Sequence, residues 1–348
     1  MTELQKEILR VYGAFKSICD KHNLRYYAAG GTKIGAVLWS GFIPWDDDID
    51  LVMPQPDLVT FLDVAKKELS KDFAVFDAIT SPHGDIIGIK VYSNSTMFTS
   101  NNLIGYPDSF TGVFIDIFPL IGAPSGAVSR ARFIDGITKI KDEMYLKKLF
   151  AIGDTPTKEL IKAYKAQAAK YTFDDSEYIF NPANSHKEEY RREEFIHAKK
   201  MKFESADIPV SDNFDAQLKQ QYGSYSKEWP EELKGSGHKS FALVNLYKSH
   251  TDYARDIQES SIHDYITHLI GYKIDLEQNV IKFGADIEDL KKRLAAELSR
   301  NNDLHDELRT RDVQIQDLVA RHSQLLESTS WRVTRPLRKA KDIIWRKK

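Results

Sequence analysis

The 348-residue sequence predicts an α/β or α+β fold, which we take as α+β, followed by a long C-terminal coiled-coil helix. Two patterns support this prediction. Short apolar segments alternate with amphipathic ones over the first two thirds of the chain, as strands and helices do in one domain. Beyond residue 256, apolar residues recur with heptad spacing. Hydrophobic residues make up 42% and charged residues 29% of the chain, which is typical of a folded, soluble protein.

The order of elements follows from periodicity and from the position of glycines and prolines. Helices are expected at residues 4–22, 32–39, 57–70 and 128–172, and strands at 26–29, 49–53, 86–92 and 113–118. We expect Pro119 to close the last of these strands. Residues 173–240 show no clear period and are expected to be irregular.

The C-terminal third carries its own pattern. With Ile266 at heptad position a, apolar residues fill most a and d positions over about nine heptads, which predicts a coiled coil over residues 256–325. Asn301, at an a position, is a polar inclusion of the kind that fixes register. A long amphipathic helix packed back on the domain is the alternative. The apolar a and d residues are Leu269, Leu276, Val280, Phe283, Ile287, Leu290, Leu294, Leu304, Leu308, Ile315, Leu318 and Leu325.

The charge of the chain is unevenly distributed. The net charge is −2, which gives no case for nucleic-acid binding. The segment from Arg332 to Lys348, however, contains eight basic residues and only one acidic residue, and Ile343, Ile344 and Trp345 lie among them. Such a segment is typical of a helix lying in a membrane interface. We therefore divide the chain into a catalytic domain at 1–250, a coiled coil at 256–325 and a basic amphipathic tail at 326–348.

Cysteine usage and hydropathy indicate a cytoplasmic protein. The chain has one cysteine, Cys19, so no disulfide framework or cysteine-based zinc site is expected. No signal-peptide core follows Met1, and no apolar run reaches the roughly 18 residues that cross a bilayer.

Three aspartates stand out because apolar residues surround them. Asp48 and Asp50 lie two apart on a predicted strand, so both side chains point to one face while Ile49 and Leu51 enter the core. Two carboxylates on one face repel unless a cation lies between them, and Mg²⁺ prefers such oxygen ligands. A solvated acidic turn is the alternative interpretation, which the apolar neighbours disfavour. Asp116, within Phe-Ile-Asp-Ile-Phe-Pro, is costly to bury unless it shares that cation.

A second motif lies upstream of the aspartates. Gly30-Gly31-Thr32 follows a predicted strand and opens a predicted helix. Backbone N–H groups at such a helix start can approach a phosphate. A glycine pair alone usually marks only a turn. The motif becomes specific for a phosphate-binding site when it occurs together with the three aspartates.

Over residues 1–240 these motifs resemble the LicD family, a branch of the nucleotidyltransferase-fold superfamily. Gly30-Gly31, Asp48-Ile49-Asp50 and Asp116 match its three elements, and the stretch Gly41–Leu51 is close to its signature. Tyr222-Gly223-Ser224-Tyr225 is similar to its closing segment. One departure concerns Leu38-Trp39, where relatives often carry Arg-His. The resemblance implies a nucleotidyltransferase-like mixed sheet.

The resemblance also implies an activity. It is the transfer of a substituted phosphate, such as phosphocholine, glycerol phosphate or ribitol phosphate, from a CDP-linked donor to a glycan hydroxyl. Asp48 and Asp50 would hold Mg²⁺ or Mn²⁺, and Asp116 would complete a second metal position or accept the hydroxyl proton. The expected substrate-binding residues are Gly30, Gly31, Thr32, Asp46, Lys90 and His238. Two alternatives remain: nucleotidyl transfer that releases pyrophosphate, and a non-catalytic scaffold of a glycan-assembly complex.

The tail has a likeness of its own. The segment from Ser328 to Arg338 is similar to the tails of bacterial surface-polysaccharide glycosyltransferases. This similarity implies a bacterial glycan-assembly setting with a lipid-linked acceptor. We expect a homo-oligomer, formed through the coiled coil, in peripheral contact with the inner face of the cell membrane.

Overall fold

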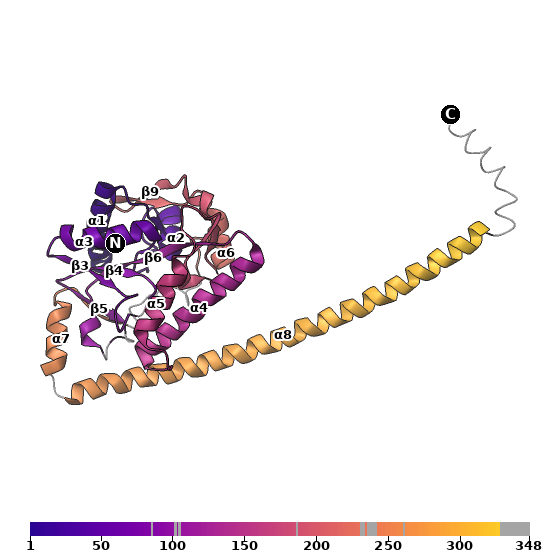
Figure 1. Cartoon of the computed structure of the whole chain (residues 1–348). Coiled ribbons are helices and arrows are strands. Elements are labelled where there is room, and N and C mark those ends of the chain that lie inside the picture. The colour runs from indigo at the N-terminus through magenta and orange to yellow at the C-terminus, as the bar shows by residue number, and fades with distance from the viewer. Residues whose placement is uncertain are drawn as a thin grey trace. The chain divides into compact units, whose positions relative to one another are not determined.

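The computed structural model describes the whole chain except residues 85, 101–102, 104–105, 186, 230–233, 235–241, 260–261 and 328–348. The chain divides into two compact units, Met1–Leu269 and Ile270–Lys348. The first unit contains the mixed sheet and its surrounding helices, and the second consists mainly of one long helix (Figure 1). The predicted α+β class is confirmed.

The central sheet of the first unit has the strand order β1-β2-β6-β4-β3. β2 and β6 are parallel, and the other pairs are antiparallel. β7 joins the far end of β6, and β8 pairs with β7. The strands are β1 (Tyr27–Ala28), β2 (Asp50–Pro54), β3 (Phe73–Asp77), β4 (Ile89–Ser93), β6 (Phe114–Ala123), β7 (Tyr178–Phe180) and β8 (Glu189–Arg191).

Two small antiparallel sheets flank the central one. They pair β5 (Met97–Ser100) with β11 (Ala242–Asn245), and β9 (Lys199–Phe203) with β10 (Ala206–Val210). Residues 173–240 are therefore not irregular as predicted, since β7 to β10 and a helix lie among them. Their strands have only three to five residues, and β9 is mostly lysine, so they carry too little apolar periodicity to be recognised.

Helices α1 to α7 belong to the first unit. The helix expected at 128–172 is in fact two helices, α4 and α5, because the chain turns at Ala151, with a positive φ of 55°, and passes Gly153 and Pro156. The helices are α1 (Glu3–His22), α2 (Gly30–Trp39), α3 (Gln55–Glu68), α4 (Ala127–Phe150), α5 (Thr157–Ala168), α6 (Phe214–Tyr222), α7 (His250–Glu259) and α8 (Ile262–Glu327). Short 3-10 turns are η2 (Pro107–Ser109), η3 (Pro182–Asn184) and η4 (Arg192–Phe195).

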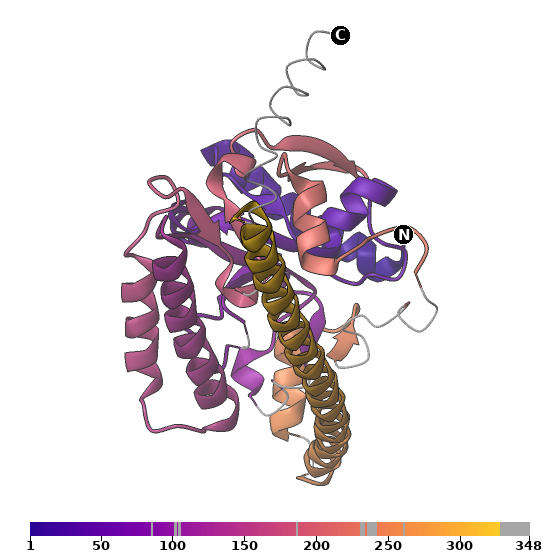
Figure 2. The same cartoon turned by 90° about the vertical axis from the view of Figure 1, so that its right-hand side faces the viewer.

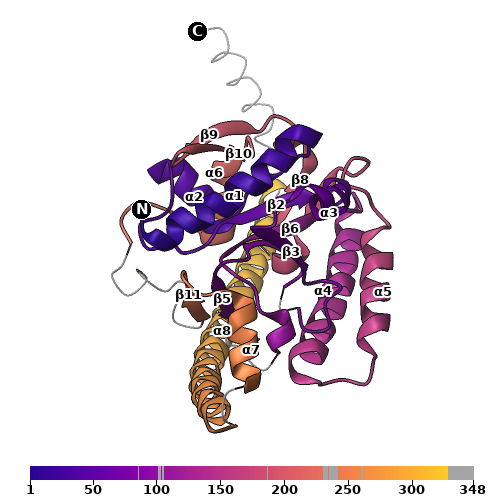
Figure 3. The same ribbon diagram turned by 90° about the vertical axis from the view of Figure 1, so that its left-hand side faces the viewer.

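Two cores pack against the central sheet. In one, Phe15 of α1 and Phe61 of α3 pack with Leu51 and Ile117 of the strands. In the other, α4 and α5, which lie side by side as a hairpin (Figures 2 and 3), pack with Ile121 and Ala123 near the end of β6. Because side chains alternate along a strand, Asp50 and Asp116 point away from the α1–α3 core.

Pro119 lies inside β6 and does not end it, which corrects the prediction. The Asp116 N–H donates to the Ile49 carbonyl on the β2 side at 2.9 Å. Backbone N–H groups point alternately to the two edges of a strand, so the nitrogen of residue 119, three residues later, faces the edge opposite β2. At that edge the pairing with β4 has stopped at Ile117, and the pairing with β7 begins at Ile121. No ladder hydrogen bond is required at this step, so proline is tolerated.

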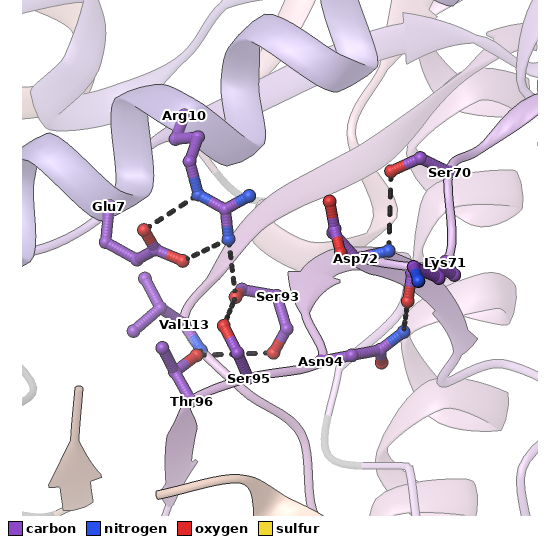
Figure 4. A network of polar contacts seen from close by, with 10 residues as sticks. All are labelled: Glu7, Arg10, Ser70, Lys71, Asp72, Ser93, Asn94, Ser95, Thr96 and Val113. Atoms are coloured by element: carbon purple, nitrogen blue, oxygen red, sulfur yellow. Dashed lines mark hydrogen bonds and ion pairs between the residues drawn. The ribbon is translucent and has the colours of Figure 1, made fainter. Parts of the chain in front are cut away.

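A polar network joins α1 to the edge of the sheet where β4 ends (Figure 4). Arg10 holds Glu7 and donates to the Ser93 hydroxyl at 2.9 Å. The Thr96 hydroxyl donates to the Ser93 carbonyl and accepts from the Val113 N–H at 2.8 Å. These bonds satisfy the backbone of the tight β4–β5 turn and fix α1 over the sheet.

The long helix α8 presents an unpartnered apolar stripe, since each described a or d leucine and isoleucine of the heptad pattern exposes more than half of its surface. These residues are Ile287, Leu290, Leu294, Leu304, Leu308, Ile315 and Leu318. None of the helices in the described part of the chain combines the length and apolar character needed to span a bilayer. The tail falls almost entirely outside the described residues.

Candidate active site

Three charged side chains form a row across the centre of the sheet. Asp50 on β2 is the register partner of Asp116 on β6, and Lys90 on β4 is the partner of Asp116 on its other side. The Lys90 Nζ donates to Asp116 Oδ1 at 3.0 Å, and both side chains are buried. The same Nζ lies 3.8 Å above the ring of Phe114. Register thus brings together Asp50, Asp116 and Lys90, three of the predicted site residues.

The segment before β2 adds further carboxylates. Oxygens of Asp46, Asp47 and Asp48 lie within 4.8 Å of one another, a spacing that can surround one cation. Asp48 is nearly buried, while Ile49 between it and Asp50 is fully buried in the core. The acidic residues therefore do not form a solvated turn. Buried Ile49 and Leu51, which alternate with Asp48 and Asp50, fix the end of this segment.

The glycine turn packs directly against this cluster. Gly30 starts α2 with a φ of +48°, and a Cβ there would lie 3.3 Å from Asp50 Oδ2. A Cβ on Gly31 would lie 3.0 Å from Asp46 Oδ2. Thr32 accepts a hydrogen bond from the Asp50 N–H at 2.9 Å, which ties the first turn of α2 to β2. Glycine is required here because the backbone approaches the carboxylates so closely.

The electrostatics of the cluster favour a bound cation. Burial, then the charge of Asp48, raises the pKa of the Asp46 carboxyl far above its ordinary value. Burial, then the charges of Asp48 and Asp116, raises the pKa of Asp50 as well. Oxygen-only ligands and a surplus of negative charge are the donor set that Mg²⁺ or Mn²⁺ takes. The residues present therefore fit a hard divalent cation.

Two further residues lie at this site that were not among the expected site residues. Burial and the charge of Asp50 raise the pKa of Tyr222, and its hydroxyl would lie 3.5 Å from a Cβ on Gly30. Tyr222 is the first residue of the Tyr-Gly-Ser-Tyr segment noted above, so the resemblance pointed to it. Buried Glu188 accepts a hydrogen bond from the neighbouring Gln221 at 2.8 Å and adds its charge at Asp50. No pattern in the sequence singles out Glu188.

A buried lysine supports the glycine turn from behind. Lys33, in the first turn of α2, donates to Gln217 Oε1 at 2.7 Å. Burial lowers the pKa of Lys33 to about 8, and the charges of Glu188 and Glu194 partly oppose this shift. Lys33 therefore fastens α2 to α6, which brings Tyr222 to the site.

Tryptophans border the site on the side of α2. Trp45, which precedes Asp46, lies between Trp39 and Trp229, with ring centroids 6.2 Å and 5.8 Å away. The Lys227 Nζ lies 5.8 Å from the centroid of the Trp39 ring, so a later segment brings a positive charge beside the end of α2. His238, a predicted substrate-binding residue, lies outside the described residues.

The region that holds this cluster is similar in sequence to known proteins. Residues 23–129, which include all four aspartates from Asp46 to Asp50 and also Asp116, match the family described as LicD/FKTN/FKRP, nucleotidyltransferase domain. The chain is also 24% identical over 269 residues to the lipopolysaccharide cholinephosphotransferase LicD of Haemophilus influenzae. That alignment covers 70% of this chain and 98% of the relative.

Proposed function

We propose, from the premise that this chain is a phosphotransferase of the LicD family, that it transfers a substituted phosphate from a CDP-linked alcohol to a sugar hydroxyl. Phosphocholine, glycerol phosphate and ribitol phosphate are the candidate groups. The observation that carries the proposal is the row of Asp50, Asp116 and Lys90 beside the glycine turn. It combines a divalent-cation site with a turn at which a diphosphate can bind.

The aspartates are the proposed metal ligands. Asp48 and Asp50, with Asp116 across the strand pair, would hold Mg²⁺ or Mn²⁺, and Asp46 lies against the glycine turn. The cation would neutralise the donor diphosphate and the charge that develops on it. Support for this set comes from the buried, mutually repelling carboxylates, which need positive charge to stay ionised together.

The remaining residues position the reacting groups. N–H groups at the start of α2, at Gly30 and Gly31, would bind donor phosphate oxygens. The sugar hydroxyl oxygen forms a bond to the phosphorus that bears the alcohol, while the bond from this phosphorus to the oxygen shared with CMP breaks. CMP leaves, and the hydroxyl proton passes to a carboxylate, for which Asp116 is the nearest candidate on the Lys90 side of the row. Lys90 would keep Asp116 ionised and correctly oriented.

The products test this function. We expect the full chain, given Mg²⁺, a glycan acceptor and each CDP-alcohol in turn, to release CMP and form a sugar phosphodiester with at least one donor. Chromatography of the nucleotides and mass spectrometry of the glycan provide the readout. Release of pyrophosphate from CTP, with no CMP from any CDP-alcohol, would instead establish nucleotidyl transfer. No turnover of any donor would favour a scaffold.

We also propose that the tail places the enzyme at the inner face of the cell membrane. Residues 326–348 carry clustered basic side chains with Ile343, Ile344 and Trp345 among them. Each basic residue near an anionic leaflet contributes about 1 kcal/mol, so this segment suffices for a reversible anchor. A lipid-linked acceptor would then lie close to the active site.

Vesicle sedimentation measures this anchoring. The full chain should bind vesicles that contain anionic lipid and should bind less as salt rises, because salt screens the attraction. A chain without residues 329–348 should stay in the supernatant. If both proteins sedimented equally, the tail would have another role, such as docking on a protein of the assembly machinery.

A further inference from the structure

A cavity of about 270 Å³ lies between the central sheet and α4. Its walls include Ile87 before β4, Phe118 of β6, and Asp142, Met144 and Tyr145 of α4. Neither the aspartates nor the glycine turn line it. The cavity therefore has no part in the metal site described above.

The strand register brings this cavity beside the metal site. Phe118 follows Asp116 by two residues on β6, so both side chains point to the same face, about 7 Å apart along the strand. Gly88 immediately precedes β4, two residues before Lys90, and a Cβ there would come within 3.3 Å of the Phe118 ring. Moving two residues along the strands, from the pair Lys90 and Asp116 to the pair Gly88 and Phe118, therefore leads from the reacting centre to the wall of the cavity.

The cavity also lies on the side from which an attacking group must come. The glycine turn contacts Asp50 on the β2 side of the row, and this is where the donor diphosphate and the departing CMP would bind. In an in-line displacement the attacking oxygen approaches opposite the leaving oxygen. Across the row from Asp50, past Asp116, the next strand is β4. The attacking hydroxyl would therefore enter from the β4 and α4 side.

The walls combine apolar surface with groups that bond hydroxyls. Phe118, Met144 and Tyr145 offer rings and a thioether to the C–H face of a ligand. Asp142 and Lys141, whose charged atoms are 3.5 Å apart, offer an acceptor and a donor. Small-molecule sites usually have a mostly apolar wall that carries a few polar groups. A sugar ring has this mixed character, with C–H faces and hydroxyl edges.

We propose that this cavity is the acceptor subsite and that it holds the sugar ring whose hydroxyl attacks the donor. The proposal rests on the proposed function for the identity of the reaction, but the binding of a sugar is a separate property. α4 would then be the element that selects the acceptor. The face of Tyr145 packs against the ring, and Asp142 accepts hydrogen bonds from its hydroxyls.

Ligand-observed NMR with the full chain tests sugar binding without turnover. The probes are the methyl glycosides of glucose, galactose and N-acetylglucosamine, with choline chloride as a non-sugar comparison. At least one glycoside should receive saturation from the wild type, and Tyr145→Ala should weaken its binding about tenfold, since an aromatic contact is lost. Tyr171→Ala is the matched control, because Tyr171 is also 38% exposed but lies outside the cavity.

The outcomes separate the two proposals. Absence of binding for every glycoside, or equal binding by Tyr145→Ala and Tyr171→Ala, would overturn the acceptor subsite. Asp142→Asn, a change of an exposed side chain that should fold normally, should reduce glycoside binding as well. CMP release from a CDP-alcohol to water should be equal in wild type and Tyr145→Ala. Glycoside binding without any CMP release would contradict the proposed function and leave the sugar site intact.

Discussion

Asp50→Asn is expected to lower the rate of CMP release by about a thousandfold or more. The substitution removes a ligand of the metal, which stabilises the charge that develops in the transition state by several kcal/mol. The substitution keeps the shape of the side chain and its backbone bond to Thr32. Asp48→Asn should behave in the same way. Initial rates at saturating donor provide the measurement, and Asp63→Asn on the exposed surface of α3 is the control.

The same substitution should stabilise the fold in the absence of metal. The pKa of Asp50 is raised in the folded state by burial and by its acidic neighbours, so its ionised form costs folding free energy at neutral pH. Asparagine removes that charge and the cost. We therefore expect Asp50→Asn to melt at a higher temperature than the wild type in chelator. An active Asp50→Asn protein, or an inactive one that is unfolded, would contradict this account.

The second large effect concerns assembly through α8. We expect the full chain to form a dimer or trimer, because a 66-residue helix with an exposed apolar stripe is stable only when another helix covers it. A second copy of the chain is the partner that we propose, since Leu294 and Leu308 repeat at heptad a positions. Leu294→Glu combined with Leu308→Glu should give a monomer in light scattering.

A matched pair of substitutions controls for added charge. Ser299→Glu combined with Val313→Glu places the same residues at heptad f positions of the same helix, away from the seam. Val313 is 67% exposed, at least as much as the seam leucines, so hydrophobicity alone does not distinguish the two pairs. The control protein should keep the oligomeric state of the wild type. A monomeric wild type would contradict the coiled-coil proposal.

Local patterns were sufficient to predict the elements that form the centre of the site. Buried Ile49 separates Asp48 from Asp50, and β2, α1 and the glycine turn occur where the sequence predicts them. β6 begins where predicted but continues through Pro119 to Ala123. The partners of these residues depend on contacts distant in sequence. Lys90 meets Asp116 only through the antiparallel pairing of β4 with β6, and a solvated strand lysine would have the same sequence pattern.

The part of the site that the sequence did not reveal comes from short or irregular segments. Glu188 follows a 3-10 turn, and its role depends on amides from Asn181, Asn184 and Gln221 that converge only in the fold. β3 was missed because its residues are all half-buried, which gives no alternation. The cavity beside Tyr145 likewise depends on how α4 lies against β6.

The aspartate cluster is proposed to act through a divalent cation, and the CMP-release assay run in chelator measures this dependence. With a CDP-alcohol donor and excess EDTA, we expect no CMP above background, and full recovery of the rate when Mg²⁺ or Mn²⁺ is added beyond the chelator. Asp50→Asn should not recover under the same addition. Undiminished CMP release by the wild type in excess EDTA would contradict the claim.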